Sequence, residues 1–142
     1  MSYDYDNVFA RILRGELPCV KLYEDDQTLA FMDIMPQAEG HALVVPKEPA
    51  ADLLSASPAA AAACIQTTQR IARAVKQALA APGIQIVQMN GAAAGQTVPH
   101  LHFHVIPRRP GENLKFHASA PVSPEKLEPI AQKIRAALQT SS

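Results

Sequence analysis

The chain has 142 residues, with 13 basic and 13 acidic side chains and an isoelectric point near 7.0. This length is typical of one domain, and a hydrophobic fraction of 48 % excludes a disordered chain. The absence of net charge argues against a protein that coats nucleic acid, because such binding depends on neutralising many phosphates. A small anionic ligand remains compatible, since a few backbone N–H groups can hold one phosphate.

The sequence also predicts where the protein resides. No apolar stretch approaches the ~20 residues that cross a bilayer, and the acidic first residues do not resemble a secretory signal. The two cysteines, Cys19 and Cys64, are not spaced as Cys-x-x-Cys, which favours free thiols in a reducing compartment. We therefore expect a cytoplasmic protein that contacts no membrane.

The first half of the chain predicts a short helix and then three strands, at residues 7–13, 20–23, 28–33 and 41–45. Ser57 and Pro58 then begin a long amphipathic helix, which ends before Pro82 and Gly83. Strands follow at residues 84–90 and 100–106, separated by a loop of small residues. A last helix is expected to begin nearer Pro129 than Pro124, because proline cannot donate a hydrogen bond inside a helix.

This order predicts an α+β fold, with a mostly antiparallel sheet of about five strands and one long central helix. The helix covers one face of the sheet and leaves the other face free for a ligand. We find no internal repeat and no linker, and so expect a single domain over residues 1–142. Its core spans about residues 7–109, followed by a variable segment over residues 110–142.

Three histidines alternate with apolar residues along the last predicted strand. Side chains alternate across a strand, so His100, His102 and His104 share one face, while the residues between them pack under the helix. Adjacent imidazoles are spaced by about 6.7 Å along the strand. Burying three imidazoles without partners is costly, which favours a functional role for the row. His117 lies apart and is interpreted as a surface or structural residue.

A metal site is one candidate for this row, because His-x-His on a strand can chelate zinc. The outer histidines are about 13 Å apart, too far to share one ion, so a metal would need two of them and another ligand. Cupin-like barrels place a glutamate shortly after His-x-His, and this chain has none there.

Nucleophilic catalysis is the second candidate. Gly95, Gln96 and Thr97 form a turn of amide and hydroxyl donors just before the row, and such a loop can point N–H groups at phosphate oxygens. A neutral imidazole beside it can attack phosphorus and form a covalent intermediate, while a second histidine assists the leaving group. The loop and the row fit this chemistry together.

The pattern His100-Leu-His-Phe-His-Val-Ile106 resembles the histidine triad motif, in which three histidines alternate with apolar residues. The similarity extends to residues 31–37, 40–46 and 94–98, and covers about residues 7–109. The chain is similar to bacterial HIT (histidine triad) nucleotide-binding proteins. This resemblance implies a homodimer that binds a purine nucleotide or nucleotide conjugate and acts at its α-phosphate without a cofactor.

The resemblance also implies roles for individual residues. His102 would be the nucleophile, and His104 and His100 would contact the phosphate or order the nucleophile. The phosphate site would be lined by Asn90, Gly95, Gln96 and Thr97. Asp33 would hold the ribose hydroxyls, with Ile34 and Phe9 near the base. His41 is interpreted as a structural strand residue, and a turn-forming role for Asn90 stays open.

Two departures from the family pattern qualify these expectations. Many bacterial members bind structural zinc through Cys-x-x-Cys near the N-terminus and a later histidine, where this chain has residues 6–9 and Pro49. We therefore expect no metal. Asp33 and Ile34 resemble the phosphoramidase (Hint-like) branch, whereas residues 95–98 and 106–108 resemble the fragile-histidine-triad (Fhit-like) branch that cleaves dinucleoside polyphosphates. His104 argues against the uridylyltransferase-like branch, which usually has glutamine there.

The sequence thus favours a nucleotidyl hydrolase or transferase that acts on nucleoside phosphoramidates through a histidine nucleophile. A dinucleoside polyphosphate hydrolase, a non-catalytic nucleotide sensor and a two-histidine metalloprotein stay open as alternatives.

Overall fold

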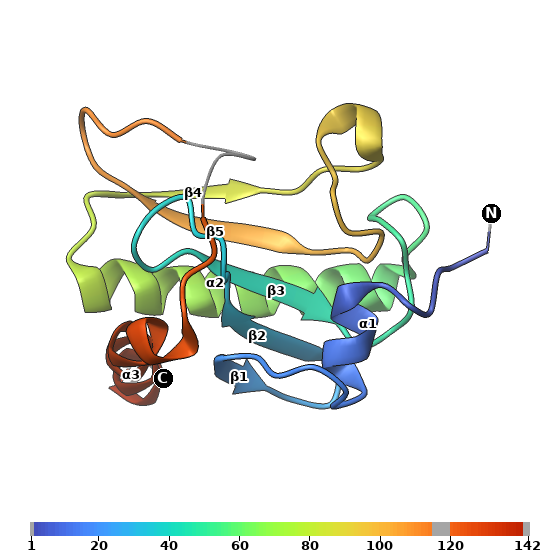
Figure 1. Cartoon of the computed structure of the whole chain (residues 1–142), viewed down its shortest axis with the longest axis horizontal. Helices are drawn as coiled ribbons and strands as arrows, with labels where there is room; N and C mark the ends of the chain where they lie inside the picture. Colours follow the sequence, from blue (N-terminus) through green and yellow to red (C-terminus); the bar gives the residue numbers. More distant parts are fainter. Residues whose placement is uncertain (1, 115–119, 141–142) are drawn as a thin grey trace.

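A computed structural model describes residues 2–114 and 120–140 of the chain (Figure 1). His117 lies outside the described residues. The elements are α1 (Val8–Leu13), β1 (Lys21–Glu24), β2 (Thr28–Met32), β3 (Ala42–Pro46), α2 (Pro58–Leu79), β4 (Gly83–Val87), the 3₁₀ turn η1 (Ala92–Ala94), β5 (Phe103–Arg108) and α3 (Pro124–Thr140). The predicted α+β fold class is confirmed.

The five strands form one antiparallel sheet in the order β1-β2-β3-β5-β4. The last strand in the sequence, β5, therefore lies between β3 and β4, and β1 and β4 are the edges. In the pairing of β3 with β5, Leu43 lies opposite His104. This insertion brings the histidine-rich segment next to the residues at the start of β3.

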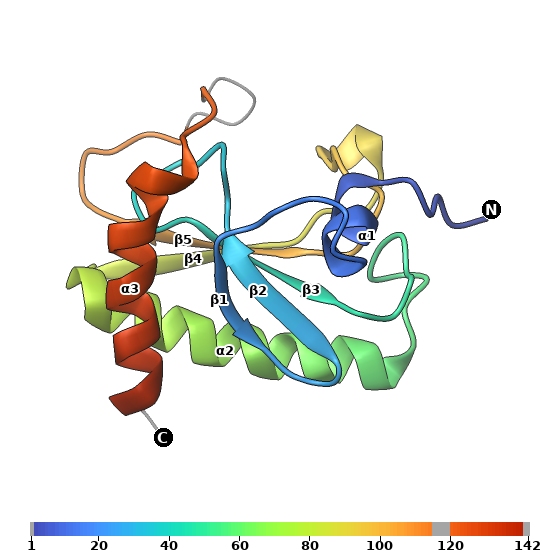
Figure 2. The same ribbon diagram turned by 60° about the horizontal axis from the view of Figure 1, so that its bottom comes forward.

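The long helix α2 covers one face of the sheet (Figure 2). Ser57 caps its first turn by accepting a hydrogen bond from the N–H of Ala60 at 3.1 Å, and Pro58 occupies the first helical position. The main core forms between this helix and the sheet. It includes Leu101, Phe103 and Val105, which pack with the buried α2 residues Cys64, Ile71 and Val75.

The short helix α1 lies on the opposite face of the sheet, near the ends of β2 and β3 (Figure 2). The side chain of Asn7 caps it by accepting a hydrogen bond from the N–H of Ala10 at 2.9 Å. Phe9 then packs in a second apolar cluster with the strand residues Leu29, Phe31, Leu43 and Val45. The sequence-based expectation that this face is free is therefore corrected, since α1 covers one end of it.

The strand β5 begins at Phe103, three residues later than predicted. Its pairing with β3 ends where Phe103 faces Val44, and two residues further along β3 stands Pro46. Pro46 has no N–H to donate, so the ladder cannot extend back to Leu101, whose N–H bonds the carbonyl of Ala50 instead. At its other end β5 continues through Pro107, because there it pairs with β4 alone.

The last helix also differs from its predicted start. It begins at Pro124 and contains Pro129 in its interior. The N–H groups of Lys126 and Leu127 both bond the carbonyl of Ser123, which forms the first turn ahead of Pro129. Leu127 is buried in the main core, and this packing outweighs the hydrogen bond that Pro129 cannot make.

Gly40 permits a close approach between the loop before β3 and the end of α2. Its φ is +97°, and a Cβ added there would lie 2.1 Å from Cδ1 of Leu79. The left-handed conformation therefore favours glycine, and any larger residue would also require the Leu79 side chain to move. Among the described helices, none combines the length and apolarity that crossing a bilayer requires.

Candidate active site

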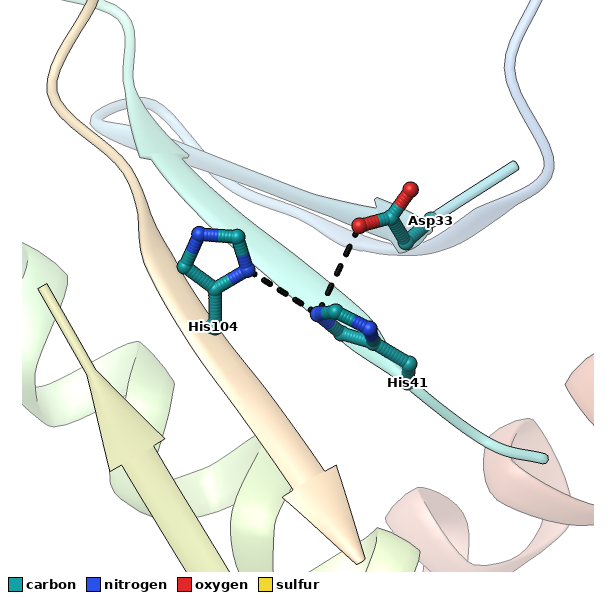
Figure 3. Close-up of side chains that lie close together, drawn as sticks. All are labelled: Asp33, His41 and His104. Atoms are coloured by element: carbon teal, nitrogen blue, oxygen red, sulfur yellow. Dashed lines mark hydrogen bonds and ion pairs between the residues drawn. The ribbon is translucent and has the colours of Figure 1, made fainter. Parts of the chain in front are cut away.

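Four histidines from two neighbouring parts of the sheet meet on the face opposite α2. His100, His102 and His104 point away from the main core, and each is at most 9 % exposed. The fourth is His41, just before β3, whose Nε2 lies 2.9 Å from Nδ1 of His104 (Figure 3). Sequence reasoning treated His41 as structural, because the contact depends on β5 lying beside β3.

The proton position on His102 follows from its backbone partner. Nδ1 lies 2.7 Å from the carbonyl oxygen of His100. A carbonyl oxygen can only accept, so Nδ1 carries the hydrogen and donates it. Burial of the ring lowers its pKa and keeps it neutral at pH 7. The second nitrogen, Nε2, therefore holds the lone pair of the neutral ring.

The opposite tautomer is imposed on His104 through His41. The backbone N–H of Gln37 donates to Nδ1 of His41 at 2.9 Å, so the hydrogen of His41 is on Nε2. That Nε2–H donates to Nδ1 of His104, which places the His104 hydrogen on its own Nε2. Burial lowers the pKa of His41 to about 3 and that of His104 to about 4, so both rings are neutral.

The two central rings therefore offer opposite functions. Their centroids are 5.0 Å apart, with the planes inclined at 64°. The neutral ring of His102 has a nucleophilic lone pair, whereas the neutral ring of His104 has an N–H donor. A nucleophile beside a proton donor is the arrangement that displacement at phosphorus requires.

Asp33, the residue directly after β2, lies next to His41. Its Oδ2 lies 3.4 Å from Nε2 of His41 (Figure 3). Its Oδ1 accepts the N–H of Met35 at 2.8 Å. Burial raises the pKa of this carboxyl group to about 6. The carboxyl group of Asp33 is thus the acidic member of a chain that runs through His41 to His104.

Asp33, His41 and His104 also form a candidate metal site, because one ligand atom from each lies within 4.8 Å of the others. The Gln37 N–H occupies the lone pair of His41 at Nδ1, so Nε2 of His41 carries a hydrogen. A metal ligand needs a free lone pair at that nitrogen. The hydrogen-bond pattern therefore favours a proton chain over a metal site at this cluster.

The loop before the histidines is more self-contained than the sequence predicts. The N–H groups of Gly95 and Gln96 bond the carbonyls of Ala92 and Gly91. The side-chain amide of Gln96 accepts from Gly91 and donates to the carbonyls of Ala51 and Val98. Both N–H groups and the Gln96 amide are thus engaged within the protein, while Thr97 is exposed.

Asn90 serves a similar fastening role. Its Oδ1 accepts the N–H of Leu53 at 2.9 Å, and its amide exchanges hydrogen bonds with Gln88. Asn90 and Gln96 together hold the segment over residues 50–57 against the loop. The resemblance assigns both residues to the phosphate site and leaves a turn-forming role open for Asn90, and the sequence does not predict their bonds to this distant segment.

The two residues expected near the base occupy different environments. Phe9 is 7 % exposed, and its ring packs edge to face against the ring of His102, with the centroids 4.9 Å apart. Ile34 is 51 % exposed, and its carbonyl accepts the N–H of Val122 at 2.7 Å. Phe9 therefore supports the His102 ring from α1, whereas Ile34 presents apolar surface to solvent.

Comparisons with known proteins identify solved structures with the same fold. A HIT-like protein from Bartonella henselae, solved with an unknown ligand, is 50 % identical with a TM-score of 0.90, covering 96 % of this chain and 99 % of that one. A zinc-bound histidine triad family protein from Mycobacterium smegmatis is 40 % identical with a TM-score of 0.84, covering 95 % and 94 %.

Two curated relatives have named activities. The adenosine 5'-monophosphoramidase of Schizosaccharomyces pombe is 37 % identical over 130 residues, which cover 89 % of this chain and 94 % of that protein. An adenylylsulfatase of Arabidopsis thaliana is 41 % identical over 104 residues, which cover 73 % of this chain but only 53 % of that protein. The HIT domain family matches residues 14–111. The chain therefore belongs to the HIT family.

Proposed function

We propose that this protein hydrolyses nucleoside phosphoramidates at the α-phosphate, with His102 as the nucleophile. The observation that carries the proposal is the bond from Nδ1–H of His102 to the carbonyl of His100, which leaves Nε2 unprotonated. The relatives named as a phosphoramidase and an adenylylsulfatase support a nucleotide hydrolase that acts on an adenosine nucleotide.

The reaction proceeds in two displacements. Nε2 of His102 attacks the α-phosphorus and the phosphorus–nitrogen bond breaks, while Nε2–H of His104 donates a hydrogen bond to the departing nitrogen, which takes a proton from solvent. The His102 ring then carries a positive charge. The Nε2–H of His41 bonds Nδ1 of His104 and so keeps the hydrogen of His104 on Nε2. Water next attacks the phosphorus, gives one proton to solvent and releases neutral His102.

The remaining parts of the site have supporting roles. Asp33 and Ile34 face the nucleoside, and the Thr97 hydroxyl meets the phosphate, together with the loop that Asn90, Gly95 and Gln96 shape. His100 orders the nucleophile through its carbonyl, and Phe9 supports the His102 ring. We further propose that the protein is a cytoplasmic homodimer, which light scattering and cell fractionation test.

A panel of substrates tests this function. Release of the nucleoside monophosphate is measured with an adenosine phosphoramidate, an adenylyl sulfate and a diadenosine polyphosphate at equal concentration. Faster turnover of the phosphoramidate supports the proposal. Preference for the polyphosphate assigns the Fhit-like alternative, and nucleotide binding without turnover of any substrate assigns a sensor.

A further inference from the structure

The carbonyl that orients His102 belongs to a residue outside the sheet ladder. His100 precedes β5, and Pro46 prevents the ladder from reaching it. Strand pairing therefore does not fix the backbone at residue 100. The Leu101 N–H, which shares a peptide plane with this carbonyl, bonds the carbonyl of Ala50, and the ring of His100 makes further contacts with other parts of the chain.

Those contacts engage both ring nitrogens of His100. Nε2 lies 2.8 Å from the carbonyl oxygen of Pro46 and must donate to it. Nδ1 is therefore an acceptor, and the hydroxyl of Tyr3 lies 2.5 Å from it. The Tyr3 oxygen in turn accepts a hydrogen bond from Nδ2 of Asn7 at 2.8 Å. Every donor in this series has an acceptor.

Tyr3 is well suited to hold its hydrogen toward His100. Burial raises the pKa of its phenol, so the hydroxyl stays protonated. The rings of Tyr3 and His100 meet edge to face, with centroids 5.7 Å apart. Asn7 is buried and is the N-cap of α1, the helix from which Phe9 contacts the His102 ring.

We propose that Tyr3 is a positioning residue for the reaction, which locks the ring of His100 and thereby holds the carbonyl that orients His102. This role rests on the proposed function. Tyr3 acts through His100, so its loss weakens the alignment of the nucleophile rather than the binding of the nucleotide. The segment from Tyr3 to Phe9 thus supports two histidines of the row: Tyr3 contacts His100, and Phe9 contacts His102.

The test compares Tyr3→Phe with Tyr5→Phe, which removes the same hydroxyl from a neighbouring tyrosine that is 62 % exposed. We expect Tyr3→Phe to lower kcat about three- to tenfold, the effect of one neutral hydrogen bond, with KM within about twofold. Tyr5→Phe leaves both constants unchanged. Nitrogen NMR of the imidazoles should show the Nδ1 signal of His100 moving downfield in Tyr3→Phe alone, because that nitrogen loses its donor.

A second variant draws the hydroxyl hydrogen of Tyr3 away from His100. Asn7→Asp preserves the helix cap, because aspartate caps as well as asparagine, but puts an acceptor in place of the Nδ2 group that donates to the Tyr3 hydroxyl and to the Asp4 carbonyl. The carboxylate competes with His100 for the hydroxyl hydrogen, so kcat should fall as in Tyr3→Phe.

Three outcomes overturn the inference. These are an unchanged kcat in Tyr3→Phe, an unchanged His100 nitrogen signal, or a loss confined to KM or to thermal stability. If the wild-type enzyme is active and any of these results is found, only the role of Tyr3 is refuted and the proposed function stands. A wild-type protein that turns over none of the nucleotide substrates refutes the proposed function, and the role of Tyr3 with it.

Discussion

Nδ1 of His102 donates its hydrogen to the carbonyl oxygen of His100 across 2.7 Å. The two residues are separated by one residue, so a short turn of backbone decides which imidazole nitrogen is available for attack. The same logic, applied through Gln37 and His41, gives His104 the opposite tautomer. Backbone groups therefore assign a different task to each ring.

Replacing the nucleophile should abolish turnover without preventing binding. In His102→Asn the amide nitrogen can still donate to the His100 carbonyl, but it has no nucleophilic lone pair. We expect kcat to fall at least about a thousandfold, while the affinity for AMP stays within about tenfold. Steady-state kinetics and calorimetry measure the two quantities. Turnover near the wild-type rate would show that another group attacks phosphorus.

The acid limb of the pH–rate profile should lie below pH 6.5, the ordinary value for histidine. Burial lowers the pKa of His102, so its lone pair survives as the pH falls through 6.5. His104 has a pKa of about 4 and also stays neutral there. The measurement is kcat/KM between pH 4.5 and 8, corrected for the uncatalysed reaction. Half-maximal activity at or above pH 6.5 would contradict the burial of these rings.

Gly40→Ala should destabilise the fold by about 2 kcal/mol, because it combines a left-handed backbone with a clash against Leu79. Gly111→Ala is the matched control, since its φ is +83° but nothing lies within 4 Å of an added Cβ. Thermal unfolding should give a clearly larger fall in Tm for Gly40→Ala. Equal shifts in the two variants would show that the Leu79 contact relaxes freely.

Gln96→Ala separates a fastening role from a phosphate contact. The Gln96 amide bonds the carbonyl of Ala51, so loss of this amide should make the segment over residues 50–57 more mobile. We expect faster proteolytic cleavage in this segment and a loss of about 1–2 kcal/mol in stability. Thr97→Ala is the comparison, with lower affinity for nucleotide and unchanged cleavage. If Gln96→Ala instead affects affinity alone, the amide contacts the phosphate.

Local patterns predicted the parts of the fold that depend on neighbours in the sequence. The alternation around His102 separates the histidines from the core whatever strand lies alongside, and the capping signal at Ser57 needs only the first turn of α2. The strand boundary at Phe103 was missed because it depends on Pro46, more than fifty residues earlier. The start of α3 was missed because burial of Leu127 against other elements compensates for Pro129.

The same limit applies to the site. His41 gained its role from the pairing of β3 with β5, which no single segment encodes. Asn90 and Gln96 have amides that suit a phosphate, and their bonds to Leu53 and Ala51 could not be predicted because that segment is distant in the sequence. The Tyr3 contact joins residues 97 positions apart. The single-domain organisation and the homodimer stay predictions.

The position of β4 at the edge of the sheet has a consequence for handling the protein. The other edge, β1, carries charged Lys21 and Glu24, and Arg135 donates to the Lys21 carbonyl. The β4 segment from Gly83 to Val87 has no charged residue, and Ile86 is 43 % exposed. An uncharged strand edge is a template for pairing with another chain, and the proposed homodimer would shield it. Dissociation of that dimer on dilution exposes the edge, so we expect a melting temperature that rises with protein concentration.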